Sequence, residues 1–153
     1  MPYRRIAQIF LLYLIRSLTL LLISFSVLPA AHAQRLALVI GNDSYLSVPV
    51  LRNARADARA VADALESAGF SVTLKTDLNE RAFLAALREF SRRVQGGDDT
   101  VFYYAGHGVQ LGGGNYLLPT DIASEDEEQV KDESIPLQRV LNDLQDQKVR
   151  FTL

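Results

Sequence analysis

The segment Tyr103-Tyr104-Ala105-Gly106-His107-Gly108 places one histidine between two glycines at the end of an apolar run. A neutral imidazole at such a place can act as a general acid or base near neutral pH. The two glycines allow backbone conformations that other residues avoid, and they allow another chain segment to approach closely. The N–H of Gly108 has no side chain beside it, so it is free to point at a substrate oxyanion. The alternative is a turn histidine whose ring caps a nearby carbonyl.

The rest of the sequence excludes several kinds of site in which His107 could take part. There is no cysteine, and the other histidine, His32, lies in an apolar N-terminal segment to which we assign no chemistry. A metal site is therefore not expected, because no second histidine or cysteine remains to hold the ion. The chain has no G-x-S-x-G elbow for a serine nucleophile. The turn after the first apolar run, residues 41–45, also lacks the glycine pattern of a nucleotide-binding loop.

Residues 1–33 are typical of a secretory signal. Arg4 and Arg5 precede an almost wholly apolar stretch without acids, and Ala31-His32-Ala33 fits a cleavage site before Gln34. The alternative is an uncleaved membrane anchor, because the apolar region reaches back to Ile6 if Arg16 is tolerated. We therefore expect an exported protein, periplasmic or extracellular, that contacts a membrane only if this segment is retained.

Residues 34–153 are expected to form one domain of 120 residues. They carry 13 basic and 18 acidic residues, a net charge of about −5, without a basic face that would indicate a nucleic-acid partner. An exported chain without cysteine has no disulfides, so its stability depends on burying a core.

Apolar runs alternate with helical patterns along this domain. Residues 35–42 form a nearly continuous apolar run typical of a strand buried on both faces. A helix follows, with Ala58, Val61, Ala62 and Leu65 on one face, and Gly69 is placed to end it in the left-handed conformation. The order then repeats through a strand at 70–74, a helix whose apolar face includes Phe83 and Phe90, and a strand at 100–106. This alternation predicts an α/β fold with a mostly parallel sheet and helices on both faces.

Four further elements are expected after His107. Residues 109–118 read as a hairpin that turns at Gly112 to Asn115. Residues 121–133 are rich in acids, but their spacing does not match a calcium-binding loop, so we expect a solvated loop. A helix follows Ser134-Ile135-Pro136, and Val149 to Leu153 begin a fourth strand.

The order of these motifs resembles a known family. ALVIGNDSY, LRNARADARAVADALESAGF, DTVFYYAGHGVQ and GGNYLLPTD together look like the first half of a bacterial caspase-like cysteine peptidase domain, the group related to metacaspases. The resemblance covers about residues 35–153. It implies a three-layer αβα fold and a cysteine-type endopeptidase acting on peptides or proteins. In that family the histidine of the Gly-His-Gly segment pairs with a cysteine that follows the next strand.

By this resemblance His107 is the catalytic histidine, and the family commonly cleaves after a basic residue. Asp57 is then the candidate for part of the specificity pocket. An equally weighted alternative is that Asp57 is a first-turn acid favoured by the helix dipole. The resemblance implies no cofactor; calcium activates some related proteins, but no feature of this sequence supports it here.

The sequence departs from the family in lacking the cysteine. A fourth strand of ordinary length would place that residue a few positions beyond Leu153. We therefore expect a domain truncated at the start of its fourth main strand, a fragment or the product of a shortened gene, inactive as a peptidase and poorly stable because of an unpaired apolar strand. The alternative function is a catalytically inactive module that binds peptides or partner proteins in the same cleft. The oligomeric state is not indicated by the sequence.

Overall fold

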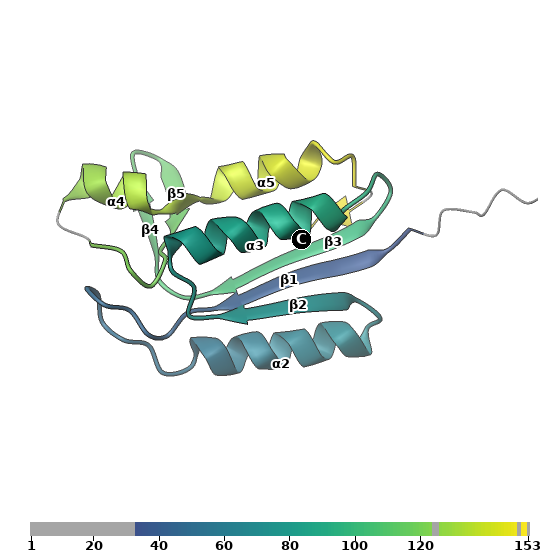
Figure 1. The fold of residues 1–153 in the computed structure, drawn as a ribbon, viewed down its shortest axis with the longest axis horizontal. Coiled ribbons are helices and arrows are strands. Elements are labelled where there is room, and N and C mark those ends of the chain that lie inside the picture. Colours follow the sequence, from purple (N-terminus) through teal and green to yellow (C-terminus); the bar gives the residue numbers. More distant parts are fainter. Residues whose placement is uncertain (1–32, 124–125, 150, 153) are drawn as a thin grey trace, which may run out of the picture. The chain divides into compact units, whose positions relative to one another are not determined.

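The computed structural model describes residues 33–123, 126–149 and 151–152, and these form one compact unit that begins at Ala33. In chain order its elements, shown in Figure 1, are β1 (Arg35–Gly41), α2 (Ala54–Ser67), β2 (Ser71–Thr76), α3 (Glu80–Arg93), β3 (Asp99–Ala105), β4 (Gly108–Leu111), β5 (Gly114–Leu117), α4 (Glu127–Glu133), β6 (Ile135–Pro136), α5 (Leu137–Gln145) and β7 (Phe151–Thr152). The signal segment predicted at residues 1–33 lies almost wholly outside the described residues. Within the described part, no helix is both long and apolar enough to cross a membrane.

The main sheet is parallel and has the strand order β2-β1-β3-β7. β1 is central and is buried on both sides, because its side chains alternate between two separate apolar clusters. Leu36, Leu38 and Ile40 belong to one cluster, and Ala37 and Val39 belong to the other. The continuous apolar run of β1 thus has the cause expected from the sequence, and the parallel α/β fold is confirmed.

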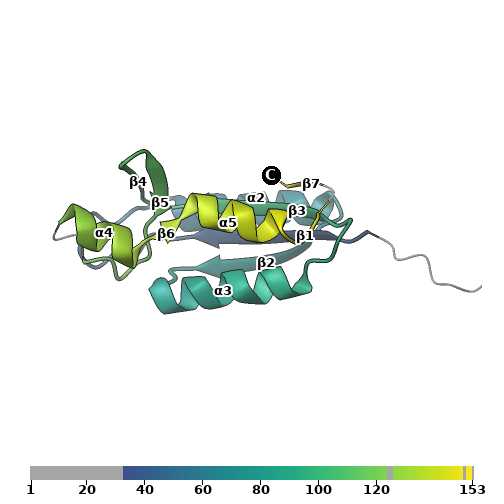
Figure 2. The same cartoon turned by 90° about the horizontal axis from the view of Figure 1, so that it is seen from above.

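Helices cover both faces of this sheet, as Figure 1 shows. α2 packs on the face that holds Ala37 and Val39, whereas α3 and α5 pack side by side on the other face (Figure 2). The strand order gives the reason. The β1-to-β2 connection moves in one direction across the sheet and the β2-to-β3 connection returns past β1, so two right-handed crossovers put their helices on opposite faces.

Capping hydrogen bonds and a glycine mark the ends of these helices. The Asn79 side chain accepts a hydrogen bond from the N–H of Ala82 and caps α3, while Gly69, with φ of 85°, follows the end of α2 as predicted. The start of α2 differs, because its own N-cap residue, Asn53, makes no side-chain capping bond. Asp43 supplies that bond from outside the helix, as described below.

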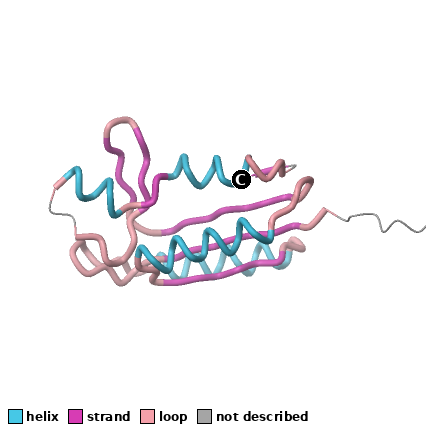
Figure 3. Tube along the Cα trace, turned by 45° about the horizontal axis from the view of Figure 1, so that its top comes forward, coloured by secondary structure: helices cyan, strands magenta, loops and turns pink. Residues whose placement is uncertain are grey.

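A second, antiparallel sheet follows β3, with the order β4-β5-β6. Its predicted hairpin is confirmed, but the turn is shorter than the predicted Gly112 to Asn115. Gly112 and Gly113, with φ of 56° and 82°, form a two-residue turn, and Gly114 and Asn115 already belong to β5. The hairpin rises away from the main sheet in Figure 3.

The expectation of a solvated loop over residues 121–133 is wrong for its second half, because residues 127–133 form α4. The Asp126 side chain caps this helix at Gln129, and Lys131 pairs with Glu127 one turn away at 2.9 Å. Acids in a first turn favour a helix, so the acidic run promotes α4 and is still largely exposed.

Candidate active site

His107 lies just beyond the carboxyl end of β3, beside the loop that leaves β1. The two strands end in register, with Gly41 opposite Ala105, and the N–H of Asn42 donates to the Ala105 carbonyl at 2.9 Å. The carboxyl ends of parallel strands are the usual place for ligands in α/β proteins. The segment 42–53 and the Gly-His-Gly turn therefore form one border of a site.

Two tyrosine hydroxyls hold the backbone of His107. The His107 N–H donates to the Tyr45 hydroxyl at 2.8 Å, and the two hydroxyls lie 2.9 Å apart. The Tyr104 hydroxyl also lies within donating distance of two carbonyl oxygens, that of Leu118 at 2.7 Å and that of His107 at 3.0 Å. The Leu118 N–H returns a bond to the His107 carbonyl at 3.0 Å. These hydrogen bonds tie the Gly-His-Gly turn to Leu118, the residue that follows β5 at the base of the hairpin.

Burial keeps both hydroxyls protonated. Tyr45 is 4% exposed. Desolvation raises the pKa of Tyr45 above its ordinary value, against the opposing effect of its hydrogen bonds to Tyr104 and to His107. Burial, with the nearby Tyr45 hydroxyl, raises the pKa of Tyr104 much further. Both groups therefore remain neutral donors over the physiological pH range.

The imidazole of His107 is also oriented. Its Nε2 lies 2.7 Å from the Pro49 carbonyl, and its ring meets the Tyr45 ring edge-on with centroids 4.7 Å apart. A carbonyl oxygen only accepts, so Nε2 carries a proton and the neutral ring has its lone pair on Nδ1. Among the described residues no hydrogen bond engages Nδ1. This nitrogen is left to act as an acid or a base.

Gly106 is required by space and not by backbone conformation. A Cβ there would lie 2.6 Å from the Tyr45 hydroxyl and would also collide with the hydroxyl of Tyr104. Neither Gly106 nor Gly108 has a positive φ. The expectation of close approach is thus confirmed at Gly106, whereas the expectation of unusual backbone conformations is wrong at both glycines.

The hairpin register directs the N–H of Gly108 outward. Gly108 lies opposite Leu117, and the Leu118-to-His107 hydrogen bond makes this a non-hydrogen-bonded pair. The backbone groups of Gly108 consequently point away from β5, and the residue is exposed. Its N–H has the freedom that an oxyanion donor needs.

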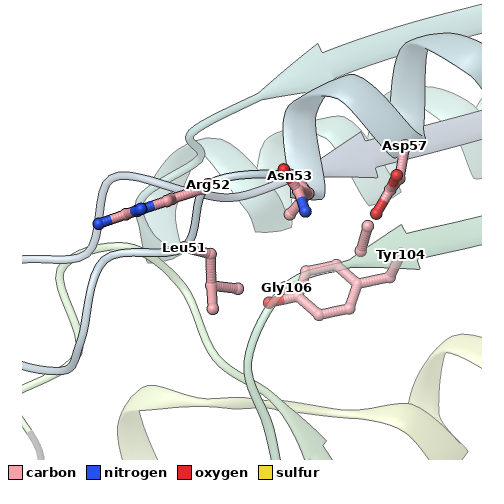
Figure 4. A pocket seen from close by; sticks show the side chains of 8 residues that line it. Leu51, Arg52, Asn53, Asp57, Tyr104 and Gly106 are labelled. Atoms are coloured by element: carbon pink, nitrogen blue, oxygen red, sulfur yellow. The ribbon is translucent and has the colours of Figure 1, made fainter.

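Asp57 borders the adjoining pocket, which has a volume of about 400 Å³. It projects from the first turn of α2 toward the space beside Tyr104 and Gly106, whereas Arg52 extends away from it (Figure 4). The two readings of Asp57 are therefore compatible, because a first-turn acid of α2 is also a lining residue. The pocket is lined by Leu51, Arg52, Asn53, Ala54, Asp57, Tyr104, Ala105 and Gly106.

A second group of residues, which the sequence did not single out, holds segment 42–53 in place. The buried carboxylate of Asp43 accepts from the N–H of Ala54 at 2.8 Å and from Arg55 Nε at 3.0 Å, so it caps α2 from a distance. Asp77 accepts from the N–H groups of Asp43 and Ser44 and pairs with Arg55 at 3.1 Å.

The partners of Asp77 change its pKa. Partial burial acts to raise the pKa of Asp77, but the N–H donors of Ser44 and Asp43 and the charge of Arg55 outweigh it and hold the pKa below its ordinary value. Asp77 has a φ of 52°, and in this left-handed conformation its carboxylate contacts the N–H groups of Asp43 and Ser44. No local pattern marks these residues, because their partners lie up to 34 positions away. Over the whole of the described ranges, this segment included, no group of three or more histidine and acidic side chains is arranged to hold a metal ion.

Comparison with known proteins gives consistent matches. The model of the caspase domain, peptidase family C14, matches residues 34–153. The mouse (Mus musculus) mucosa-associated lymphoid tissue lymphoma translocation protein 1 homolog is 33% identical over 87 residues, which is 57% of this chain and 10% of that protein. The human (Homo sapiens) protein of that name is 32% identical over 87 residues, covering 57% of this chain and 11% of its own length. The aligned region thus spans about a tenth of these relatives.

Proposed function

This chain belongs to the caspase-domain family of peptidases, and from that premise we propose that residues 34–153 are the histidine-bearing part of a cysteine endopeptidase that cleaves proteins after Arg or Lys. The observation that carries the proposal is the oriented imidazole of His107, with Nε2 bound to the Pro49 carbonyl and Nδ1 open. The 153 residues contain no cysteine, so the nucleophile belongs to a residue outside them.

The geometry supports a two-step acyl transfer. Nδ1 of His107 takes the thiol proton, and the thiolate attacks the scissile carbonyl carbon while the N–H of Gly108 donates to the developing oxyanion. The imidazolium then protonates the leaving amine as the C–N bond breaks, which leaves a thioester. His107 next takes a proton from water as the hydroxide attacks the thioester carbon. The C–S bond then breaks, the imidazolium returns its proton to the departing thiolate, and the peptide acid is released. The Pro49 carbonyl keeps the ring oriented through both steps.

The main sheet explains how a thiol would reach His107. β7 runs parallel to β3, with Asp99 opposite Phe151. Adjacent strands lie about 4.8 Å apart, so a residue at the carboxyl end of a fully formed fourth strand would lie beside the end of β3. This supports a dyad between His107 and a cysteine that follows β7.

Asp57 is the proposed acid for the basic P1 side chain, P1 being the residue that carries the scissile carbonyl. The full chain has no thiol and is expected to bind peptides without cleaving them, so affinity can be measured at equilibrium. Asp57→Asn is expected to weaken a peptide ending in Arg about tenfold, as for the loss of a charge-assisted hydrogen bond. Asp63→Asn, an exposed acid on the same helix, is the control. Equal affinities for all three chains, measured by calorimetry, would exclude this role.

The absence of cysteine also favours a second function, a catalytically inactive module that binds peptides in the same cleft. The nucleotide sequence downstream of the Leu153 codon separates the two. An in-frame or frameshifted continuation that encodes a cysteine after the fourth strand supports the peptidase. A stop codon without such a continuation supports the binding module.

Export is part of the proposal and rests on residues 1–33 alone. Amino-terminal sequencing of the protein from the cell envelope is expected to begin at Gln34. An intact Met1 in the membrane fraction would instead identify an anchor.

A further inference from the structure

The outer edge of β4 is unpaired in the part of the chain that the structure describes, and it begins at the proposed oxyanion donor. β4 is an outermost strand of the order β4-β5-β6. Gly108 and Gln110 are both exposed. An open strand edge with its own N–H and C=O groups is a template for another extended chain.

Two observations show which backbone groups line this edge. The two-residue turn at Gly112 and Gly113 makes Leu111 and Gly114 the hydrogen-bonded pair that closes the hairpin. Counting back along β4, Gln110 is then in a non-hydrogen-bonded pair. The Leu118-to-His107 bond at the other end of the hairpin independently gives Gly108 the same orientation. The N–H and C=O groups of both Gly108 and Gln110 therefore point outward.

We propose that the β4 edge binds the main chain of the substrate on the leaving-group side, as an added parallel strand. This rests on the proposed function. The outward groups of Gly108 and Gln110 are about 6.8 Å apart, the repeat of two residues in an extended chain. A peptide whose P1 carbonyl accepts from Gly108 therefore presents the P2′ carbonyl, two residues later, to the N–H of Gln110. The P2′ N–H donates to the Gly108 carbonyl.

The position of the pocket sets the direction of the added strand. Tyr104 and Gly106 line the pocket together with Asp57 of α2, and α2 and the β4–β5 hairpin lie on opposite sides of the end of β3 (Figure 1). A peptide parallel to β4 has its P1 residue beside the pocket and its primed residues, those after the scissile bond, beside β4. The opposite direction would place P1 to P3 on β4.

Gln110→Pro tests this pairing, because it removes the outward N–H without removing a hairpin hydrogen bond, and proline is tolerated at strand edges. Gln110→Ala is the matched control. The probes are two peptides bound to the full chain: one ends at the P1 Arg, and the other continues for four primed residues. We expect Gln110→Pro to weaken the longer peptide about fivefold, the equivalent of about 1 kcal/mol, and to leave the shorter peptide unchanged.

A ligand-side measurement keeps the proposal testable if Gln110→Pro does not fold, as judged by circular dichroism. N-methylation of the P2′ amide of the longer peptide is expected to weaken its binding to the unaltered chain by a similar factor, about fivefold. N-methylation at P3′, whose N–H points away from a parallel partner strand, is expected to cost little.

The outcomes separate this inference from the proposed function. Asp57-dependent binding that responds to neither Gln110→Pro nor P2′ methylation overturns the β4 pairing alone. Weakening of the shorter peptide by Gln110→Pro overturns the direction, since it places P1 to P3 on β4. Failure of both peptides to bind overturns the pairing together with the proposed function.

Discussion

Gly106→Ala tests whether the tyrosine hydroxyl pair holds the catalytic turn. The new Cβ would lie 2.6 Å from the Tyr45 hydroxyl and 2.6 Å from Cζ of Tyr104, so both rings must move. Their movement breaks the contact between the hydroxyls and the bond from the His107 N–H. Two buried neutral hydrogen bonds at about 1 kcal/mol each predict a loss of about 2 kcal/mol in the free energy of unfolding, within the usual range for overpacking. Because φ at Gly106 is not positive, none of this loss is backbone strain.

Urea unfolding of the full chain, followed by far-ultraviolet circular dichroism, measures this loss. Gly96→Ala is the control, because its Cβ would meet no atom closer than the Gln147 carbonyl at 3.6 Å. We expect the control to lie within about 0.5 kcal/mol of the unaltered chain. A Gly106→Ala midpoint that coincides with that of the control, at equal slope, would refute the steric reasoning and the importance of the hydroxyl pair.

Three further substitutions test other parts of the structure. Tyr45→Phe leaves the His107 N–H without its acceptor; we expect a loss of about 1 to 2 kcal/mol in unfolding free energy, together with a shift of the His107 imidazole nitrogen resonances that Tyr103→Phe does not cause. For Asp77 the folded-state pKa lies below the ordinary value of 3.8, so its stabilisation is present above that pH and is lost as the pH falls through the folded-state pKa. The unfolding free energies of the unaltered chain and Asp77→Asn are therefore expected to differ at pH 6 and to approach each other as the pH falls below 3.8, and a constant difference would contradict this. Phe83→Ala empties a fully buried position on the core-facing side of α3 and should lower the unfolding free energy by about 3 to 5 kcal/mol, as measured from the same urea curves.

The expectation of poor stability stays a prediction, although the structure shows a packed core. β7 is paired with β3 over Phe151 and Thr152, and α5 packs on the core through Val140 and Leu144. The described strands thus bury an apolar core on both sheet faces. The outer edge of β7 remains unpaired among the described residues, so aggregation through that edge stays a prediction. A soluble monomer with a cooperative thermal transition would contradict it.

The sequence by itself determined the alternation of strands and helices and the position of His107 at the end of a strand. Both depend on local pattern: apolar period, turn glycines and the end of a strand are readable within a few residues. The acidic segment 121–133 shows the limit of such reading, because a run of acids indicates solvated surface but does not distinguish a loop from a helix. The Asp126 cap, the first-turn acids and the Lys131–Glu127 pair all favour α4.

Only the tertiary structure decided how the site is held. Pro49 orients the ring of His107 from 58 positions away, and Tyr45 binds its N–H from 62 positions away. Asp43 and Asp77 hold the connecting segment through partners on separate elements. Such bonds depend on which loops meet at the carboxyl edge of the sheet, and that is set by strand order and not by any local pattern. The sequence therefore identified the histidine, while the fold selected the nitrogen left open for chemistry.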